Sequence, residues 1–211
     1  MQGDGEMHKI YNIFSPVIVE KFPLHNKIKK DLLKLIGESK DTPYKNVTLT
    51  MYDDLAKTDW PLSSNFKKRK WVNKYGQDIC NFLSELAIIL GYTKIEVSRL
   101  WYQQYKKNQT HGWHQHARNY SGVYYLEYPE NTEPTQFLFT EDLHKTFSVK
   151  VKEGDMILFP SYIIHRSPPL QSDKRKTIIS WNLDFLKIHS DLVYDRKTHY
   201  VEEIPEESDS N

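Results

Sequence analysis

The sequence predicts a mainly β fold with flanking helices, of the antiparallel sandwich or jelly-roll type. Two segments with helical spacing of apolar residues come first, and from residue 93 the spacing changes to two, the period of a half-buried strand. Aromatic residues make up 13% of the 211 residues, which suits a fold rich in strands. Strands that follow helices in this way are expected to form sheets with the helices packed outside one of them.

The first 92 residues are expected to form one strand, two helices and an irregular polar segment. Both helical segments repeat apolar residues every three to four positions, and a glycine, Gly37 or Gly91, stands at the end of each. Glycine is common where a helix stops. In chain order, the expected elements are an extended strand over 10–22, a helix over 24–38, irregular chain over 41–73 and a helix over 75–90.

The following residues are expected to form seven short strands. Groups of Pro, Gly, Asn and Asp stand between them, as at 129–131, 153–155 and 168–173, and such groups are typical of turns. The expected strands cover residues 94–105, 112–117, 121–128, 135–141, 146–152, 156–164 and 176–185.

The chain is expected to form a single domain over residues 1–201. No linker rich in Pro, Gly or Ser separates the helices from the strands. Residues 1–92 would supply helical and irregular support, and residues 93–201 would form the β core. The acidic stretch 202–211 is expected to be a disordered tail, because it has too few apolar residues to pack.

Charge and cysteine content bear on partners and compartment. A net charge of +1 argues against a nucleic-acid partner, because such partners need a basic surface. Cys80 is the single cysteine, so an intrachain disulfide is impossible, which fits a reducing compartment. No segment reaches about 18 apolar residues, and the first residues have no apolar signal region. A cytoplasmic protein without a membrane partner is therefore expected, and its oligomeric state stays open.

Histidines supply the strongest functional pattern. His114 and His116 are two residues apart, so on a strand they would face the same side, with Cα atoms roughly 6.6 Å apart, and could bind one ion. His165 closes the apolar run 156–164 and could add a third ligand from a distant strand. Iron, zinc, copper and nickel all accept imidazole. The alternatives are exposed strand histidines and a hydrogen-bonded core histidine, and His111 is expected outside the ligand set.

The motifs around these histidines, taken in order, resemble the 2-oxoglutarate/Fe(II)-dependent oxygenases. The resemblance is greatest to oxygenases assigned to tailed phages and marine bacteria, relatives of the prolyl 4-hydroxylases, and covers roughly residues 100–185. It implies a double-stranded β-helix, the cupin-like jelly roll. The motifs are His114-x-His116, Ser121-Gly-Val-Tyr-Tyr-Leu126, Glu153-Gly-Asp, Leu158-Phe-Pro-Ser-Tyr-Ile-Ile-His165-Arg, and Lys176-Thr-Ile-Ile-Ser-Trp-Asn182.

The resemblance implies that His114 and His165 bind Fe(II), with three positions left for 2-oxoglutarate and O₂. His116 stands where the wider superfamily has Asp or Glu. A carboxylate would neutralise one charge of the iron, whereas a third imidazole leaves the site at 2+. Either His116 is the third ligand, or water or a nearby acid takes that position. Zinc as a structural ion and nickel also stay open.

The resemblance also implies a pocket for 2-oxoglutarate. The family places a basic residue at the start of the strand that follows the distal histidine, and a hydroxyl residue four positions later. Lys176 and Ser180 have this spacing. Strand alternation puts them and Asn182 on one face of the strand, and turns Arg175 to the other face. Two tyrosines fall where related hydroxylases contact 2-oxoglutarate. The expected pocket residues are Lys176, Ser180, Asn182, Tyr105 and Tyr125.

The function implied is hydroxylation of an unactivated C–H bond, in which 2-oxoglutarate and O₂ give succinate and CO₂. Ascorbate is expected to help, and the substrate is expected to be a small molecule or a peptidyl residue. If a phage encodes the protein, it would act in the host cytoplasm. Two alternatives stay open: a non-catalytic cupin-like protein that binds a metal or ligand, and a three-histidine dioxygenase without cosubstrate. Neither of them needs Lys176 and Ser180.

Overall fold

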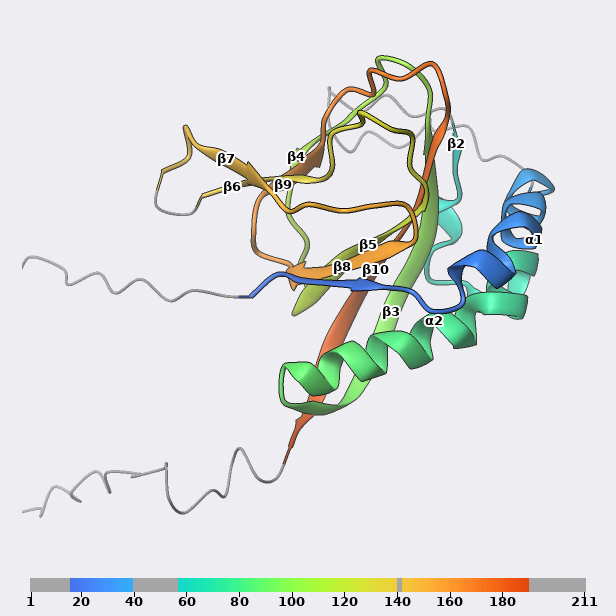
Figure 1. The fold of residues 1–211 in the computed structure, drawn as a ribbon. Helices are drawn as coiled ribbons and strands as arrows, with labels where there is room; N and C mark the ends of the chain where they lie inside the picture. Colours follow the sequence, from blue (N-terminus) through green and yellow to red (C-terminus); the bar gives the residue numbers. More distant parts are fainter. Residues whose placement is uncertain (1–15, 40–56, 140–141, 190–211) are drawn as a thin grey trace, which may run out of the picture.

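The structure, a computed structural model, describes residues 16–39, 57–139 and 142–189 as two antiparallel sheets with two helices (Figure 1). The larger sheet has the strand order β1-β8-β5-β10-β3-β2, and the smaller has the order β4-β9-β6-β7. This is a jelly-roll arrangement, as the two-residue spacing predicts. The elements are β1 (Ile18–Lys21), α1 (His25–Gly37), β2 (Lys57–Thr58), η2 (Trp60–Leu62), η3 (Phe66–Lys68), α2 (Lys70–Ile89), β3 (Tyr92–Tyr105), β4 (His111–His114), β5 (Tyr120–Glu127), β6 (Gln136–Leu138), β7 (Thr146–Ser148), β8 (Asp155–Pro160), β9 (His165–Ser167) and β10 (Lys176–Ile188).

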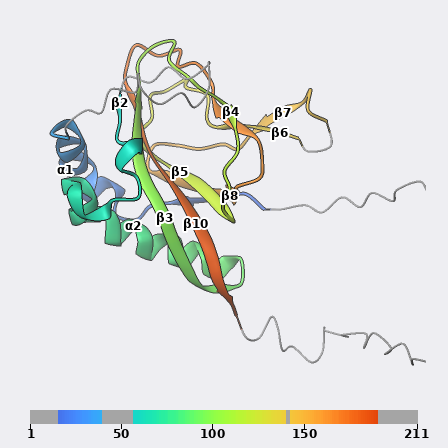
Figure 2. The same ribbon diagram turned by 180° about the vertical axis from the view of Figure 1, so that it is seen from behind.

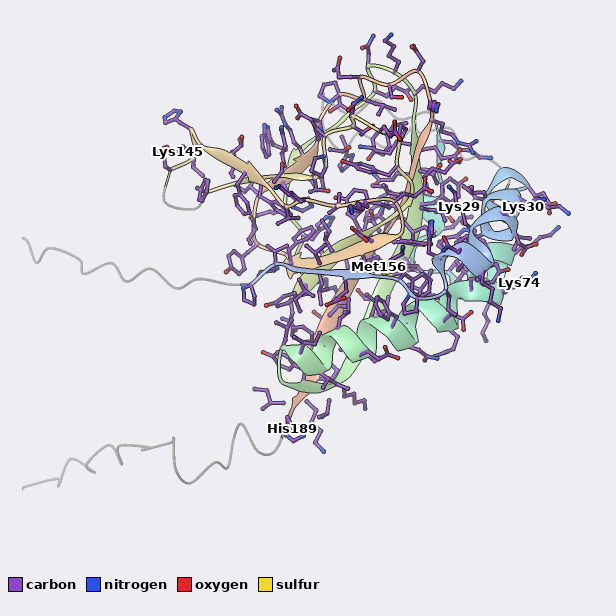
Figure 3. All side chains as sticks on the ribbon, in the orientation of Figure 1. Lys29, Lys30, Lys74, Lys145, Met156 and His189 are labelled. Atoms are coloured by element: carbon purple, nitrogen blue, oxygen red, sulfur yellow. The ribbon has the colours of Figure 1, made fainter. Side chains whose placement is uncertain are left out.

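The two faces of the larger sheet have different partners. Both helices lie along its outer face (Figures 1 and 2). Ile179 and Trp181 of β10 pack in the apolar cluster beneath the helices, together with the fully buried Met156 of β8 (Figure 3). Ile178, which alternates with them, packs in a second cluster between the two sheets. The inner face therefore carries the side chains that can line a site within the jelly roll.

Helix α2 begins at Lys70, whereas the sequence predicts a start near residue 75. Trp71 and Val72 in this first turn are buried against the core. The residue before the helix, Arg69, donates hydrogen bonds to Asp59 (3.0 Å) and to the Leu100 carbonyl (2.5 Å). This tertiary anchoring starts the helix inside a segment whose polar composition suggested irregular chain.

The expected strand over 156–164 is wrong in its last part. Strand β8 ends at Pro160, and a turn follows in which the Ile163 N–H donates to the Pro160 carbonyl (3.1 Å). His165 therefore opens β9, in the other sheet, and does not close β8. The apolar pattern could not show this, because Ile163 stays buried between the sheets although it lies in a turn.

Strands β6 and β7 are shorter than expected, because they end at Leu138 and Ser148. Their hairpin projects from the body of the molecule, with Lys145 near its tip (Figure 3). The opening strand pairs only over Ile18–Lys21. Residues 10–15, 41–56 and 190–211, including the predicted acidic tail, lie outside the described residues, so the single-domain boundary stays a prediction. Within the described ranges, no helix is long and apolar enough to cross a membrane.

Candidate active site

The three histidines singled out in the sequence converge at the smaller sheet. His114 ends β4, His165 opens β9, and the two are direct cross-strand partners. His116 lies two residues beyond β4, whereas the sequence placed it on the strand, and its N–H donates to the Ser161 carbonyl (3.0 Å). One ligand atom from each imidazole lies within 4.8 Å of the other two. The arrangement can therefore hold one metal ion.

Hydrogen bonds fix which nitrogen of two imidazoles faces the site. His114 Nδ1 lies 2.7 Å from the Gly112 carbonyl oxygen, and His165 Nδ1 lies 2.8 Å from the Ile163 carbonyl oxygen. A carbonyl oxygen only accepts, so both Nδ1 atoms carry the proton, and Nε2 is the nitrogen that can bind a metal. Such bonds to the second nitrogen orient ligand histidines in metal sites.

Burial keeps two of these imidazoles, those of His116 and His165, neutral near pH 7. It lowers the pKa of His116 to about 3 and holds the pKa of His165 well below its usual value, and neighbouring imidazoles add to both shifts. A histidine must be neutral to donate its lone pair to a metal. Three imidazoles form a donor set that fits Fe(II), and also Zn(II) or Ni(II). Among the described residues, this group contains no carboxylate.

His111 lies beside the histidine group. On β4, it lies opposite Ser167 of the neighbouring strand β9. Its ring packs edge-on against the ring of His114, with ring centroids 4.1 Å apart. Burial also holds the pKa of His111 well below its usual value. The ring therefore packs against His114, and the place of His111 outside the ligand set stays a prediction.

A cavity of about 270 Å³ opens onto the three histidines. This is slightly below the roughly 300–1,000 Å³ of ordinary ligand pockets. Trp60 and Trp101 line one part of it, and Tyr105 and Ser167 line another. The described residues that line the cavity include no Asp or Glu. Such a lining suits an anionic ligand.

Lys176 is buried beside the cavity and points inward. Its ammonium group donates to Ser167 Oγ and lies 4.4 Å from the centre of the Tyr105 ring. Burial lowers the pKa of Lys176 to about 7. Arg175 is exposed and pairs outside with Glu127, with 2.8 Å between Nε and Oε2. The alternation expected along β10 thus places the lysine inside and the arginine outside.

The other expected pocket residues are divided between two groups. Ser180 donates to Gln103 Oε1 (3.3 Å), and both residues line the cavity. Asn182 Oδ1 accepts a hydrogen bond from Ser121 (2.9 Å) in a buried polar group further along the strand. The Tyr125 hydroxyl lies 2.9 Å from Thr135 Oγ1, and burial raises its pKa to about 12. The hydroxyl in contact with Lys176 is therefore that of Ser167, and not that of Ser180.

Sequence reasoning missed three cavity residues. Ser167 stands two residues after His165, so strand alternation could have placed both on one face. Trp101 stands four residues before Tyr105 on β3, and the same rule could have found it. Trp60 had no signal, because it comes from the segment 41–73, which was expected to be irregular.

Residues 99–182 match the sequence model of a family described as "Putative 2OG-Fe(II) oxygenase". The matched segment runs from β3 to β10 and contains all three histidines of the group and Lys176. The match covers less than half of the 211 residues and shows a likeness to the 2OG-Fe(II) oxygenases in the β core. The comparison with curated proteins finds no match. The enzyme type that the motifs suggested is thereby confirmed.

Solved structures show the same fold at low sequence identity. A 2OG-Fe(II) oxygenase family oxidoreductase from Burkholderia pseudomallei is 10% identical, with a TM-score of 0.58 and coverage of 82% of this chain and 86% of that one. The viral collagen prolyl hydroxylase of Paramecium Bursaria Chlorella virus-1, in its 2OG complex, is 15% identical, with a TM-score of 0.54 and coverage of 79% and 94%. A prolyl hydroxylase from Trichoplax adhaerens is 16% identical, with a TM-score of 0.54 and coverage of 79% and 82%. The predicted double-stranded β-helix is thus confirmed.

Proposed function

We propose that this oxygenase hydroxylates an unactivated C–H bond, with conversion of 2-oxoglutarate and O₂ into succinate and CO₂. One observation carries the proposal: three neutral imidazoles converge at a cavity that has a buried lysine beside it. The histidines supply a site for Fe(II), and the lysine supplies a partner for a carboxylate. The substrate is proposed to be a small molecule or a peptidyl residue, and ascorbate is proposed to help the reaction.

His114, His116 and His165 are proposed to hold the iron. When bound, Fe(II) supplies the activation of O₂ and the oxidising power that side chains lack. The Nδ1–H groups of His114 and His165 donate hydrogen bonds to backbone carbonyls, so the two rings are oriented before a metal binds. With His116 as third ligand, the protein adds no negative charge to the ion.

Lys176 and Ser167 are proposed to hold the distal carboxylate of 2-oxoglutarate. Lys176 Nζ donates to Ser167 Oγ, so the serine hydroxyl proton is directed elsewhere and can be donated to a carboxylate. Tyr105 lies beneath the ammonium group and restricts its position. Together, the two donors would orient the cosubstrate so that its 2-oxo acid end faces the histidines.

A non-catalytic cupin-like metal protein is the second candidate, because three imidazoles suit Zn(II) as well as Fe(II). The buried lysine favours the oxygenase. Burial of an ammonium group costs free energy, and a protein that only binds a metal has no use for that cost. A three-histidine dioxygenase without cosubstrate is disfavoured for the same reason.

Two measurements test the proposal. Elemental analysis of protein loaded anaerobically with Fe(II) should find one iron per chain, none after His114→Ala or His165→Ala, and retained iron after His116→Asp. Under air, the loaded protein should release succinate from 2-oxoglutarate slowly even without substrate. Iron retained in both alanine variants would refute the site, and succinate no higher than in His165→Ala would favour the non-catalytic alternative.

The cosubstrate site has a matched pair of variants. Lys176→Ala should raise the 2-oxoglutarate concentration required for half-maximal succinate release by about tenfold or more. Arg175→Ala should change it little, because that side chain is exposed and paired with Glu127. A larger effect at Arg175 than at Lys176 would contradict the proposed binding face.

A further inference from the structure

The inward side chains of β3 follow the cavity from one end to the other. They stand at every second position, so successive members are roughly 6.6 Å apart. Tyr105 lies beneath Lys176, Gln103 accepts from Ser180, and Trp101 packs against His116 with ring centroids 6.0 Å apart. Arg99 is the next member, opposite Asn182 on β10. Trp101 lines the cavity, and Arg99 continues the row beyond it, at the end away from Lys176.

Trp60 lies in sequence before the segment that matches the oxygenase family, and in the fold it packs at this end of the row of β3 side chains. Its ring packs against Trp101 at a centroid distance of 4.5 Å and lines the cavity. The adjacent Asp59 is buried and holds the segment in place, because it accepts hydrogen bonds from the Tyr102 N–H (2.8 Å) and from Trp71 Nε1 (2.8 Å). Trp60 is therefore part of a fixed cavity wall, although it comes from a segment with little regular structure.

Arg99 has contacts that orient its guanidinium group without neutralising it. The group lies 4.8 Å from the centre of the Trp60 ring and donates to Ser63 Oγ (3.2 Å). Among the described residues, no carboxylate pairs with Arg99. The nearby Arg118 differs, because it is paired with Asp184 at 2.8 Å. A guanidinium group that is stacked on an aromatic ring keeps donors for a bidentate bond to a carboxylate or phosphate.

The charge of the loaded site favours an anion at this end. With three neutral imidazoles, Fe(II) keeps two positive charges, and the protonated Lys176 adds one. The two carboxylates of 2-oxoglutarate compensate two of these three charges. The described cavity lining adds the positive charge of Arg166 and has no Asp or Glu that could compensate the charge that remains. A substrate that brings its own negative group would do so.

We propose that Trp60, Trp101 and Arg99 form the substrate end of the cavity, and that the substrate carries an oxyanion. Arg99 binds that carboxylate or phosphate, and the apolar part of the substrate lies against the two indole rings. The inference rests on the proposed function, because it places the substrate opposite the cosubstrate lysine. Trp60 and Trp101 are then specificity residues for the same reaction.

Three small probes test this substrate class: 3-phenylpropionate, its neutral amide 3-phenylpropionamide, and phenethyl phosphate. Each is titrated by calorimetry, without O₂, into full-length protein loaded with Zn(II) and saturated with 2-oxoglutarate. An anionic probe should bind about tenfold more tightly than the amide. A preference for the carboxylate or for the phosphate identifies which oxyanion the site takes. Equal binding of acid and amide, or no binding of any probe, overturns the inference.

Variants decide whether Arg99 is responsible. Arg99→Gln should remove the preference for the anion, whereas Arg118→Gln, which removes a paired charge near the same end, should keep it. Trp60→Phe should weaken all three probes. Binding of 2-oxoglutarate to the wild-type protein and to each variant is the control. A wild-type protein that does not bind 2-oxoglutarate would refute the proposed function. An Arg99→Gln protein that binds 2-oxoglutarate and keeps the preference for the anion would refute only this inference. If Arg99→Gln disturbs folding, Arg99→Lys gives a second variant, which retains the charge.

Discussion

At the residue scale, the unusual feature of the site is a buried ammonium group that has no carboxylate partner in the part of the chain that the structure describes. The ammonium group of Lys176 contacts Ser167 and the Tyr105 ring, and burial lowers its pKa to about 7. Such an environment is costly unless a ligand later supplies negative charge. The position of Lys176 at the cavity is thus explained by a ligand carboxylate, and two predictions follow from its contacts.

Ser167→Ala should weaken 2-oxoglutarate binding more than Ser180→Ala does. Ser167 is in hydrogen-bond contact with Lys176, whereas Ser180 donates to Gln103. Loss of one hydrogen bond to a charged group costs about 1.5–3 kcal/mol, or roughly a tenfold to hundredfold change in the dissociation constant. Calorimetric titration of Zn(II)-loaded protein without O₂ measures both variants. A larger loss for Ser180→Ala would return the hydroxyl role to the position that the family pattern favours.

Binding of 2-oxoglutarate should weaken as the pH rises above about 7. The cosubstrate is a dianion and prefers the protonated lysine, whose pKa in the ligand-free protein is about 7. Affinity should be nearly constant below that pH and fall by about tenfold per pH unit above it, until the raised pKa of the bound state is reached. Dissociation constants of the Zn(II)-loaded protein between about pH 6.5 and 8.5 give the profile. Lys176→Arg should flatten it, because arginine stays charged; an unchanged profile in that variant would assign the titration to another group.

At the element scale, the short segment from β2 to η3 is held by one buried ion pair. Asp59 and Arg69 are both almost fully buried, with 3.0 Å between Oδ2 and Nη1. Arg69 also donates to the Leu100 carbonyl, and Asp59 accepts from the backbone of Tyr102, so the pair joins this segment to β3 and to the start of α2. These contacts fix the position of Trp60 beside the cavity.

Asp59→Ala should destabilise the protein by about 3 kcal/mol or more, because it leaves the buried Arg69 without its partner. The free energy of unfolding in urea measures this effect. Asp173→Ala is the matched control, because Asp173 pairs with Lys107 at the exposed surface and should change stability by less than about 1 kcal/mol. Similar losses in the two variants would show that the buried pair does not hold this segment.

At the scale of the whole molecule, Gly122 of β5 leaves room for groups of both neighbouring strands, β8 and β10, at the centre of the larger sheet. A Cβ atom there would lie 2.1 Å from the Ile157 carbonyl oxygen and 2.5 Å from the Trp181 ring. Trp181 belongs to the cluster beneath the helices, and Ile157 to the cluster between the sheets. The missing side chain thus permits the close approach of the Ile157 carbonyl and the Trp181 ring within the larger sheet.

Gly122→Ala should destabilise the protein by about 3 kcal/mol, at the upper end of ordinary overpacking effects, because backbone cannot move aside as a flexible side chain can. Gly37→Ala is the control: nothing lies within 4 Å of a Cβ at that position, so stability should stay the same or rise by about 0.5 kcal/mol. Thermal and urea unfolding measure both. A Gly122→Ala protein as stable as the wild type would mean that the neighbouring strands can move apart at this position without cost.

Sequence reasoning determined those features that depend on local periodicity or on motif order. The fold class, the two helices, most strands and the grouping of His114, His116 and His165 follow from spacing alone or from the family motifs. The inward position of Lys176 and the outward position of Arg175 follow from alternation, which is a local property of a strand.

Only the tertiary structure decided which distant groups meet. The turn after Pro160 carries His165 into the second sheet. The sequence did not predict this turn, because Ile163 within it is buried between the sheets and continues an apolar pattern typical of a strand. The contacts of Lys176 with Ser167, and of Trp60 with Trp101, join residues from separate elements. Such contacts arise from pairing of strands and from buried polar anchors that are far apart in sequence, so neither periodicity nor motif order carries them.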